Sequence, residues 1–98
     1  MAHYAIHDPI MADPRYHQKY VDAGLDPIEA KYASLIEGMD TSLGDIMDYL
    51  VAKKADKNTI IIFMSDNGGL STVPPRGGPE HTQNSPLKAG KDSVNEGG

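Results

Sequence analysis

The stretch TIIIFMSDNGG, residues 59–69, decides the fold of this chain. Five apolar residues at 60–64 run without interruption into a carboxylate, an amide and two glycines. An unbroken apolar run of this length is typical of a β-strand that is covered on both faces. Ligands of open α/β sheets bind outside the carboxyl ends of such strands. The sequence therefore predicts an α/β fold with a buried strand at 59–64 and a candidate ligand loop directly after it.

The candidate loop carries two oxygen donors, the carboxylate of Asp66 and the amide of Asn67. Hard oxygen donors without Cys or His suit Ca²⁺ or Mg²⁺ rather than Zn²⁺. The alternative is an ordinary Asn-Gly hairpin turn. A hairpin needs a second strand immediately afterwards, and the proline- and glycine-rich residues 70–79 do not provide one. From these residues alone, a metal site and a turn both remain open.

A long amphipathic helix precedes the strand. Asp26 is placed as its N-cap, Pro27 as its first residue and Glu29 as the return partner of a capping box. We expect the helix to reach about Lys54, roughly 28 residues or about 42 Å. Its apolar residues recur every three or four positions, namely at Ile28, Tyr32, Leu35, Ile36, Met39, Leu43, Ile46, Met47 and Leu50. A helix that feeds a buried strand suggests a βαβ crossover, which needs more strands than this chain contains.

The other segments are less regular. Residues 4–6 are consistent with the tail of a strand that Asp8-Pro9 ends, so that His7 lies just past a strand end. Residues 10–25 are expected to be an irregular connection with a helical turn near 16–20. Residues 70–85 are expected to form a mobile loop. Lys91, flanked by small residues, is able to present a point charge to an anion. Taken by position alone, His7 and Lys91 are interpreted more simply as solvated surface residues.

Composition excludes several classes of function. With 98 residues the chain has room for one small domain. A net charge of −5 gives no general attraction to nucleic acid or to an anionic membrane. The absence of cysteine excludes a disulfide, a thiolate metal site and a cysteine nucleophile in these residues. No apolar run approaches the roughly 20 residues of a membrane span.

Four motifs in order resemble the sulfatase family, the arylsulfatase-like sulfuric ester hydrolases of the alkaline-phosphatase-like superfamily. They are His7-x-Pro9, the helix segment at 32–44, the SDNGG loop at 65–69 and the PLKAGK…EGG segment at 86–98. The resemblance covers nearly the whole chain. It implies a partial alkaline-phosphatase-like fold, with one long helix packed on a buried strand and a sheet that is incomplete here. Residues 1–98 would then be a single partial domain, a middle-to-late slice of the catalytic domain.

The resemblance also implies roles for single residues. Asp66 and Asn67 match the second pair of ligands to the active-site Ca²⁺ of the family. His7 matches a histidine that contacts the substrate sulfate and its leaving oxygen, and Lys91 matches a lysine that binds the sulfate. Related two-zinc phosphoesterases tend to carry a histidine where this chain has Asn67. The amide therefore favours the one-metal sulfatase branch.

Two parts of the family's active site have no counterpart in this sequence. The nucleophile, a Cys or Ser in a C/S-x-P-S-R motif that becomes formylglycine, is absent, and so is the first pair of acidic metal ligands. We therefore expect weak Ca²⁺ binding and no turnover from the chain alone. Asp92 and Asn95 also depart from the family pattern, and Asp92 would repel sulfate beside Lys91.

Two further interpretations stay open. The chain is also consistent with a short non-catalytic protein that self-associates through uncovered sheet edges or binds a partner. It is further consistent with a fragment of a related phosphoesterase. Family resemblance implies a periplasmic, secreted or lysosomal location and a sulfate ester as substrate of the parent enzyme.

Overall fold

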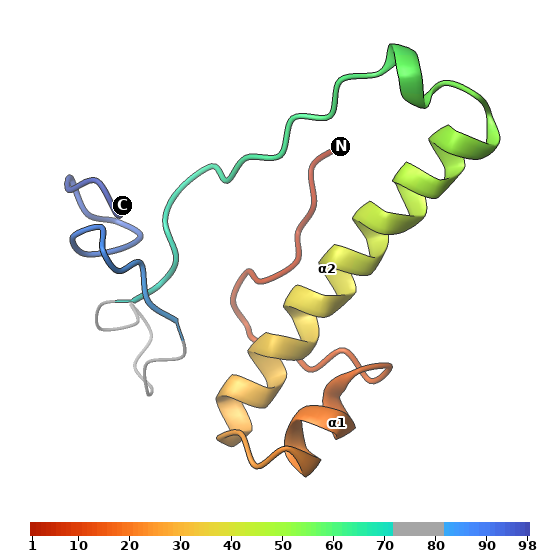
Figure 1. The fold of residues 1–98 in the computed structure, drawn as a ribbon. Helices are drawn as coiled ribbons and strands as arrows, with labels where there is room; N and C mark the ends of the chain where they lie inside the picture. Colours follow the sequence, from red (N-terminus) through yellow and green to blue (C-terminus); the bar gives the residue numbers. More distant parts are fainter. Residues whose placement is uncertain (72–81) are drawn as a thin grey trace. The chain divides into compact units, whose positions relative to one another are not determined.

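The fold is dominated by one long helix (Figure 1). The computed structural model describes residues 1–71 and 82–98. In these ranges the elements are α1 (His17–Asp22), α2 (Pro27–Ala52) and the short 3-10 helix η1 (Asp56–Asn58). The chain divides into two compact units, Met1–Ile61 and Ile62–Gly98. All three elements belong to the first unit, and each unit is described by itself below.

Helix α2 begins where the sequence predicts it. The side chain of Asp26 accepts a hydrogen bond from the backbone N–H of Ile28 at 2.9 Å, and Pro27 is the first helical residue. This bond satisfies one of the N–H groups that the first turn of a helix leaves unpaired. The helix has 26 residues, about 39 Å at 1.5 Å per residue. It ends at Ala52, two residues before the predicted end at Lys54.

Helix α1 contacts the N-terminal half of α2 (Figure 1). It overlaps the helical turn predicted near 16–20. Three polar contacts join α1 and the segment before it to α2. The N–H of Asp13 donates to Ser34 Oγ at 3.0 Å, and Tyr16 Oη donates to Thr41 Oγ1 at 3.0 Å. The third contact is an ion pair at 2.5 Å between Lys19 Nζ and a carboxylate oxygen of α2.

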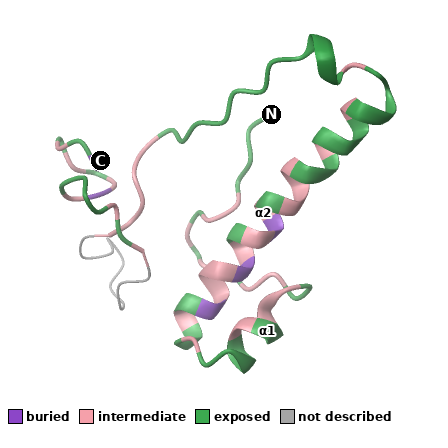
Figure 2. Cartoon of the chain, in the orientation of Figure 1, coloured by how far each residue is buried: buried purple, intermediate pink, exposed green. Residues whose placement is uncertain are grey.

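The buried stripe of α2 consists of small residues. Ala30, Ser34 and Gly38 are buried and spaced four residues apart, so they lie on one face of the helix (Figure 2). Small side chains let the segment at 13–15 approach the helix closely. A Cβ on Gly38 would lie 2.5 Å from Asp13 Oδ2. The larger apolar residues are mostly half-buried, and Ile36 and Met47 are exposed.

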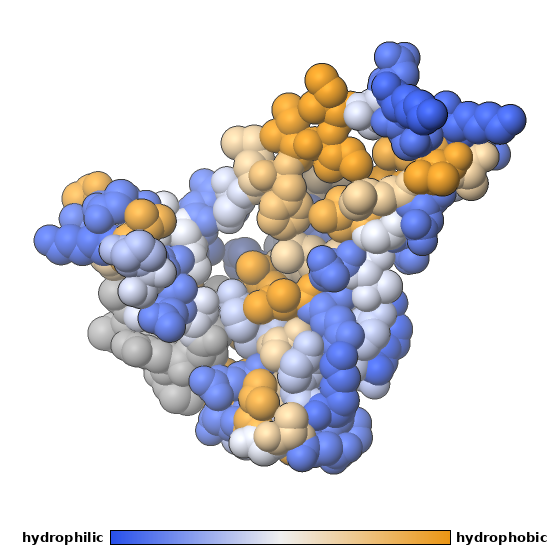
Figure 3. Space-filling model, in the orientation of Figure 1, coloured by the Kyte–Doolittle hydropathy of each residue, from blue (hydrophilic) through white to orange (hydrophobic). Residues whose placement is uncertain are grey.

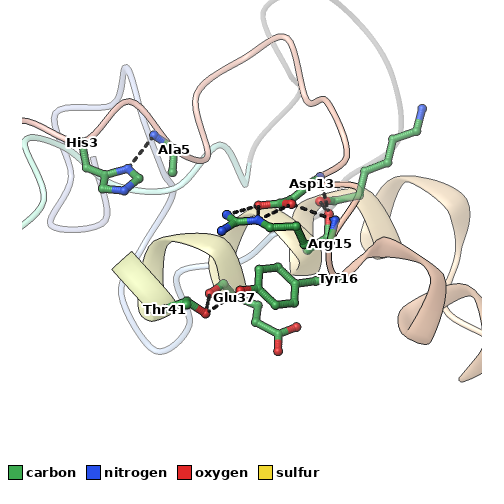
Figure 4. Close-up of polar contacts among 9 residues, drawn as sticks. His3, Ala5, Asp13, Arg15, Tyr16, Glu37 and Thr41 are labelled. Carbon is green, nitrogen blue, oxygen red and sulfur yellow. Dashed lines mark hydrogen bonds and ion pairs between the residues drawn. The ribbon is translucent and has the colours of Figure 1, made fainter. Parts of the chain in front are cut away.

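An ion pair fixes the segment that precedes α1 (Figure 4). Arg15 Nη2 lies 2.7 Å from Asp13 Oδ2, and the N–H of Arg15 donates to Asp13 Oδ1 at 3.0 Å. The side-chain hydrogen bonds from Arg15 hold the pKa of the Asp13 carboxyl below its ordinary value. Asp13 therefore stays ionised and its carboxylate stays above Gly38.

The apolar run that was expected to be a buried strand is exposed. Within the described residues there is no strand, and residues 59–64 form an unpaired extended segment. Ile60 is 89%, Ile62 78% and Met64 79% exposed, and hydrophobic residues are visible at the surface in Figure 3. A strand is stabilised by hydrogen bonds to neighbouring strands and by packing on its faces. The described residues offer neither, so the burial predicted for this run is absent from the structure of this chain.

The segments predicted at 4–6 and 70–85 have different outcomes. Residues 4–7 form a turn in which the N–H of His7 donates to the carbonyl of Tyr4 at 3.4 Å, so the predicted strand tail is wrong for this structure. Of the loop expected at 70–85, residues 72–81 lie outside the described residues. Neither helix in the described part of the chain is long and apolar enough to cross a membrane.

Candidate functional site

The SDNGG loop at 65–69 lies near the start of the second unit. Ser65 Oγ donates to the carbonyl of Asn67 at 2.5 Å, which closes a tight turn around Asp66. The side chain of Asp66 is exposed and that of Asn67 is half-buried. Gly68 lies directly against the backbone carbonyl of Gly97, and a Cβ would not fit between them. The glycine thus allows the C-terminal segment to reach the loop that carries both oxygen donors.

The amide of Asn84 joins the end of this loop to the segment that contains Lys91. Its Oδ1 accepts a hydrogen bond from the N–H of Gly69 at 3.0 Å. Its Nδ2 lies 2.9 Å from the carbonyl of Gly69, 2.9 Å from Ser71 Oγ and 3.1 Å from the carbonyl of Ala89. One side chain therefore uses both its acceptor and its donors to connect the backbone of Gly69, the hydroxyl of Ser71 and the backbone of Ala89.

The backbone of Lys91 is hydrogen-bonded to the end of the SDNGG loop. Its backbone N–H donates to the carbonyl of Gly69 at 2.9 Å, and its side chain is half-buried. A further hydrogen bond, from Ser71 Oγ to the carbonyl of Ala89 at 3.1 Å, runs beside it. Three of the four predicted site residues, Asp66, Asn67 and Lys91, thus belong to one hydrogen-bonded unit.

The segment around Lys91 is closed by Glu96. Glu96 Oε1 accepts a hydrogen bond from the backbone N–H of Lys88 at 3.1 Å, and the N–H of Gly97 donates to the carbonyl of Lys88 at 3.0 Å. The backbone N–H groups of Glu96 and then Lys88 lower the pKa of the Glu96 carboxyl. An ionised Glu96 therefore holds the two ends of this loop together.

His7, the fourth predicted residue, belongs to the first unit. Its ring stacks on Tyr4 with the ring centroids 4.9 Å apart. Its Nδ1 lies 2.6 Å from the carbonyl oxygen of Asp8. Because a carbonyl only accepts, Nδ1 is the donor in this contact and carries a proton. The neutral imidazole then has its lone pair on Nε2.

A cavity of about 590 Å³ lies between the N-terminal segment and α2. Its lining includes His3 and His7 from the N-terminal segment and Leu35, Met39 and Asp45 from α2. His7 is thus among the residues that line a hollow within its own unit.

The two oxygen donors of the loop are too few to hold a metal ion by themselves. Asp66 and Asn67 are oxygen ligands of the kind that Ca²⁺ takes, but Ca²⁺ needs six to eight of them. In residues 1–71 and 82–98, no group of three or more His, Cys, Asp or Glu side chains is arranged to hold a metal ion. The pair therefore fits calcium by donor type, and two ligands would supply only part of a coordination shell.

Asn84 was not among the predicted site residues. One signal was present: Asn side chains in loops often bond to nearby backbone, and Asn84 stands two residues before Pro86. What the sequence does not show is that the partners lie 13 to 15 residues earlier, at Ser71 and Gly69.

Comparison with known proteins gives the chain a family. The family model described as Sulfatase matches residues 1–91. The chain is 36% identical to a sulfatase from Formosa agariphila, over 97% of this chain and 18% of that protein. It is 32% identical to arylsulfatase J from Mus musculus, over 100% of this chain and 15% of that protein. It is 35% identical to N-acetylgalactosamine-6-sulfatase from Rattus norvegicus, over 72% of this chain and 13% of that protein.

These 98 residues thus span less than a fifth of the length of the relatives they match. The match nevertheless covers both the long helix and the SDNGG loop, and it runs through Lys91. The chain belongs to the sulfatase family.

Proposed function

We propose that these residues supply one half of the active site of a sulfatase, a sulfuric ester hydrolase. Asp66 and Asn67 are proposed as two of the calcium ligands, and Lys91 and His7 as contacts to the sulfate group. One observation carries the proposal. The hydrogen bond from the N–H of Lys91 to the carbonyl of Gly69 keeps the oxygen-donor loop and the lysine in one structural unit.

The chemistry of these groups suits a sulfate ester. Calcium, when bound, supplies positive charge that stabilises the oxygens of the reacting sulfuryl group. Lys91 adds a compact positive charge from the protein itself. His7, with Nδ1 engaged by the Asp8 carbonyl, has Nε2 to carry and release a proton at the leaving oxygen. Each of these groups stabilises negative charge that increases as the ester bond breaks.

The fold of the family supports a specific role for the exposed apolar run. Membership in the sulfatase family implies an alkaline-phosphatase-like α/β fold. We propose that residues 59–64 form a strand of its central sheet, with α2 packed on that strand. The support is chemical: three isoleucines, a phenylalanine and a methionine in sequence lie exposed in this chain, which is costly in water and favourable inside a sheet.

The substrate class and the location in the cell follow from the same proposal. The substrate class is a sulfate ester, and the expected location is the periplasm, the outside of the cell or the lysosome. Asn67 supports a sulfatase over a two-zinc phosphoesterase, because an amide oxygen is a poor zinc ligand and a good calcium ligand.

The proposal can be tested by transplanting the segment. Residues 1–98 would replace the matching stretch of the Formosa agariphila sulfatase, and hydrolysis of an aryl sulfate would be measured against calcium concentration. We expect an active chimera in which Lys91→Ala lowers kcat/KM about 100-fold, the usual effect of removing one group that stabilises charge in the transition state.

Two comparisons make the test decisive. Lys57→Ala, which removes an exposed lysine of η1, is the matched control and is expected to leave kcat/KM unchanged. Asp66→Ala is expected to raise the calcium concentration needed for half-maximal activity. Equal activity of the Lys91→Ala and Lys57→Ala chimeras, both folded by thermal unfolding, would contradict the proposed function.

A second function, self-association without catalysis, is favoured by one observation. The run at 60–64 is apolar, extended and exposed, and unpaired strand edges of this kind recruit another chain. Sedimentation velocity of the 98-residue chain distinguishes the two proposals. A stable monomer at micromolar concentration excludes self-association and leaves the sulfatase proposal intact.

A further inference from the structure

We infer that Asn84 is a positioning residue of this site. Its side-chain amide fixes the backbone of the SDNGG loop to the backbone beside Lys91, and so sets the spacing between the metal ligands and the sulfate-binding lysine. The inference rests on the proposed function for the roles of Asp66, Asn67 and Lys91. The geometry on which it depends is independent of those roles.

The first support is the number and direction of the contacts. The Oδ1 of Asn84 accepts from Gly69, and its Nδ2 lies within 3.1 Å of oxygens of Gly69, Ser71 and Ala89. A primary amide offers two N–H donors and one oxygen acceptor, and all of this capacity is used here. A surface asparagine with a merely solvated amide would not bond to three separate residues, two of them through their backbone.

The second support is where these contacts lead. The carbonyl of Gly69 accepts both from Asn84 Nδ2 and from the N–H of Lys91. Gly69 is two residues from the proposed ligand Asn67, and Ala89 is two residues from Lys91. Asn84 therefore acts at the point where the ligand loop and the lysine segment meet.

The third support is the close fit around the amide. Gly90 is buried, and a Cβ there would crowd the carbonyl oxygen of Gly69 and Ser71 Oγ and would lie 2.8 Å from Asn84 Nδ2. No real side chain fits there without displacing the amide or the two oxygens that it contacts. Gly90→Ala is therefore a second way to break the same arrangement without touching Asn84 itself.

The chemistry explains why asparagine is suited to this position. Aspartate keeps the acceptor for the N–H of Gly69 but loses every donor from Nδ2. Alanine loses both. Without the amide, two of the hydrogen bonds among the described residues would still join the segments, one between the backbones of Lys91 and Gly69 and one between Ser71 and Ala89. Small errors in the placement of reacting groups lower the reaction rate strongly, by about 100-fold for a displacement of 1 Å.

Nuclear magnetic resonance of the ¹⁵N-labelled 98-residue chain tests the geometry directly. We expect nuclear Overhauser effects from the side-chain amide protons of Asn84 to Gly69, Ser71 and Ala89. We also expect Asn84→Ala to accelerate hydrogen exchange at the N–H groups of Gly69 and Lys91 by about tenfold, the effect of losing hydrogen bonds of ordinary strength. Asn84→Asp should accelerate exchange at Lys91 and leave Gly69 protected.

Controls separate a local effect from unfolding. Asn95→Ala, the same substitution at a half-buried asparagine of the same unit, is expected to leave both amides unchanged. The signals of α1 and α2 report whether the first unit is intact in each variant. Absence of the three Overhauser effects in the unmodified chain, or unchanged exchange at Lys91 in both Asn84→Ala and Gly90→Ala, overturns the inference.

The active chimera described above tests the positioning role. Asn84→Ala is expected to raise the inhibition constant of inorganic sulfate about tenfold while the calcium concentration for half-maximal activity stays unchanged. A purely structural loss would reduce the amount of active enzyme and leave the sulfate inhibition constant unaltered. If Lys91→Ala raises this constant and Asn84→Ala does not, the positioning role is excluded and the proposed function stands. If Lys91→Ala changes nothing, the proposed function fails whatever the Overhauser effects show.

Discussion

Two glycines of α2 permit a matched test of how the first unit is packed. Gly38 lies in the buried stripe, and a Cβ there would lie 2.5 Å from Asp13 Oδ2 and 3.4 Å from Arg15 Nη2. At Gly44, in the same helix, a Cβ would meet nothing within 4 Å. Alanine in place of glycine stabilises a helix interior by about 1 kcal/mol at either position. Any difference between the two variants therefore measures the packing of the segment at 13–15 on the helix.

The structure predicts a large difference. Gly44→Ala should raise the free energy of unfolding by about 1 kcal/mol, which corresponds to about 4–8 °C in Tm for a unit of this size. In Gly38→Ala the carboxylate of Asp13 has to move by about 0.5 Å or more to reach an acceptable contact of 3.0 Å. Overpacking costs about 1–3 kcal/mol. The net effect of Gly38→Ala is then between no change and a loss of about 2 kcal/mol.

The measurement is urea unfolding followed by circular dichroism at 222 nm, where both helices contribute. The double variant Asp13→Ala with Gly38→Ala removes the obstructing carboxylate and should recover the helix gain, so that the two substitutions are coupled in a double-mutant cycle. Equal stabilisation by Gly38→Ala and Gly44→Ala would refute the close packing of Asp13 on α2. If Gly38→Ala stabilises the chain less than Gly44→Ala even in the Asp13→Ala background, the obstruction is not the Asp13 carboxylate.

Three further predictions use other parts of the chain. Asp26→Ala removes the N-cap of α2 and should lower the free energy of unfolding by about 1 kcal/mol. Asp40→Ala, on the exposed face of the same helix, should change it by less than about 0.5 kcal/mol. Thermal unfolding followed by circular dichroism at 222 nm compares the two variants. The amide shift of Lys88 should report a Glu96 titration below the ordinary range of a glutamate, because the folded pKa is lowered. The hydrogen bond from the N–H of Lys88 to Glu96 is therefore fully formed above the pKa that Glu96 has in the unfolded chain. It is lost as the pH falls through the lower pKa that Glu96 has in the folded chain. Glu96→Gln should abolish the titration. The 98-residue chain alone should not hydrolyse an aryl sulfate, because it lacks the family nucleophile, and turnover above trace rate in a continuous assay would contradict this.

Local signals were enough to predict the long helix. Asp26, Pro27 and the apolar spacing that follows act within a few residues of one another, and α2 begins where they place it. The family could also be predicted, because four motifs occur in a fixed order, and the match over residues 1–91 confirms it.

Features that depend on distant partners could not be predicted. The run at 60–64 has the composition of a buried strand, but burial requires neighbouring strands, and the structure leaves these residues exposed. The contact face of α2 was also not evident, because its buried members are Ala30, Ser34 and Gly38 rather than the large apolar residues. Asn84 was missed because its partners are far away in sequence. The roles of His7, Asp66, Asn67 and Lys91 stay predictions.

The contacts that join α1 and the segment before it to α2 have a consequence for the order of folding. The residues they join are close in sequence: 21 positions apart for Asp13 and Ser34, 25 for Tyr16 and Thr41, and 18 for Lys19 and Glu37. Helical structures with such short-range contacts fold within microseconds to milliseconds, whereas pairing of distant strands is slower. We therefore expect the helical pair to form during synthesis, as soon as residue 52 has left the ribosome.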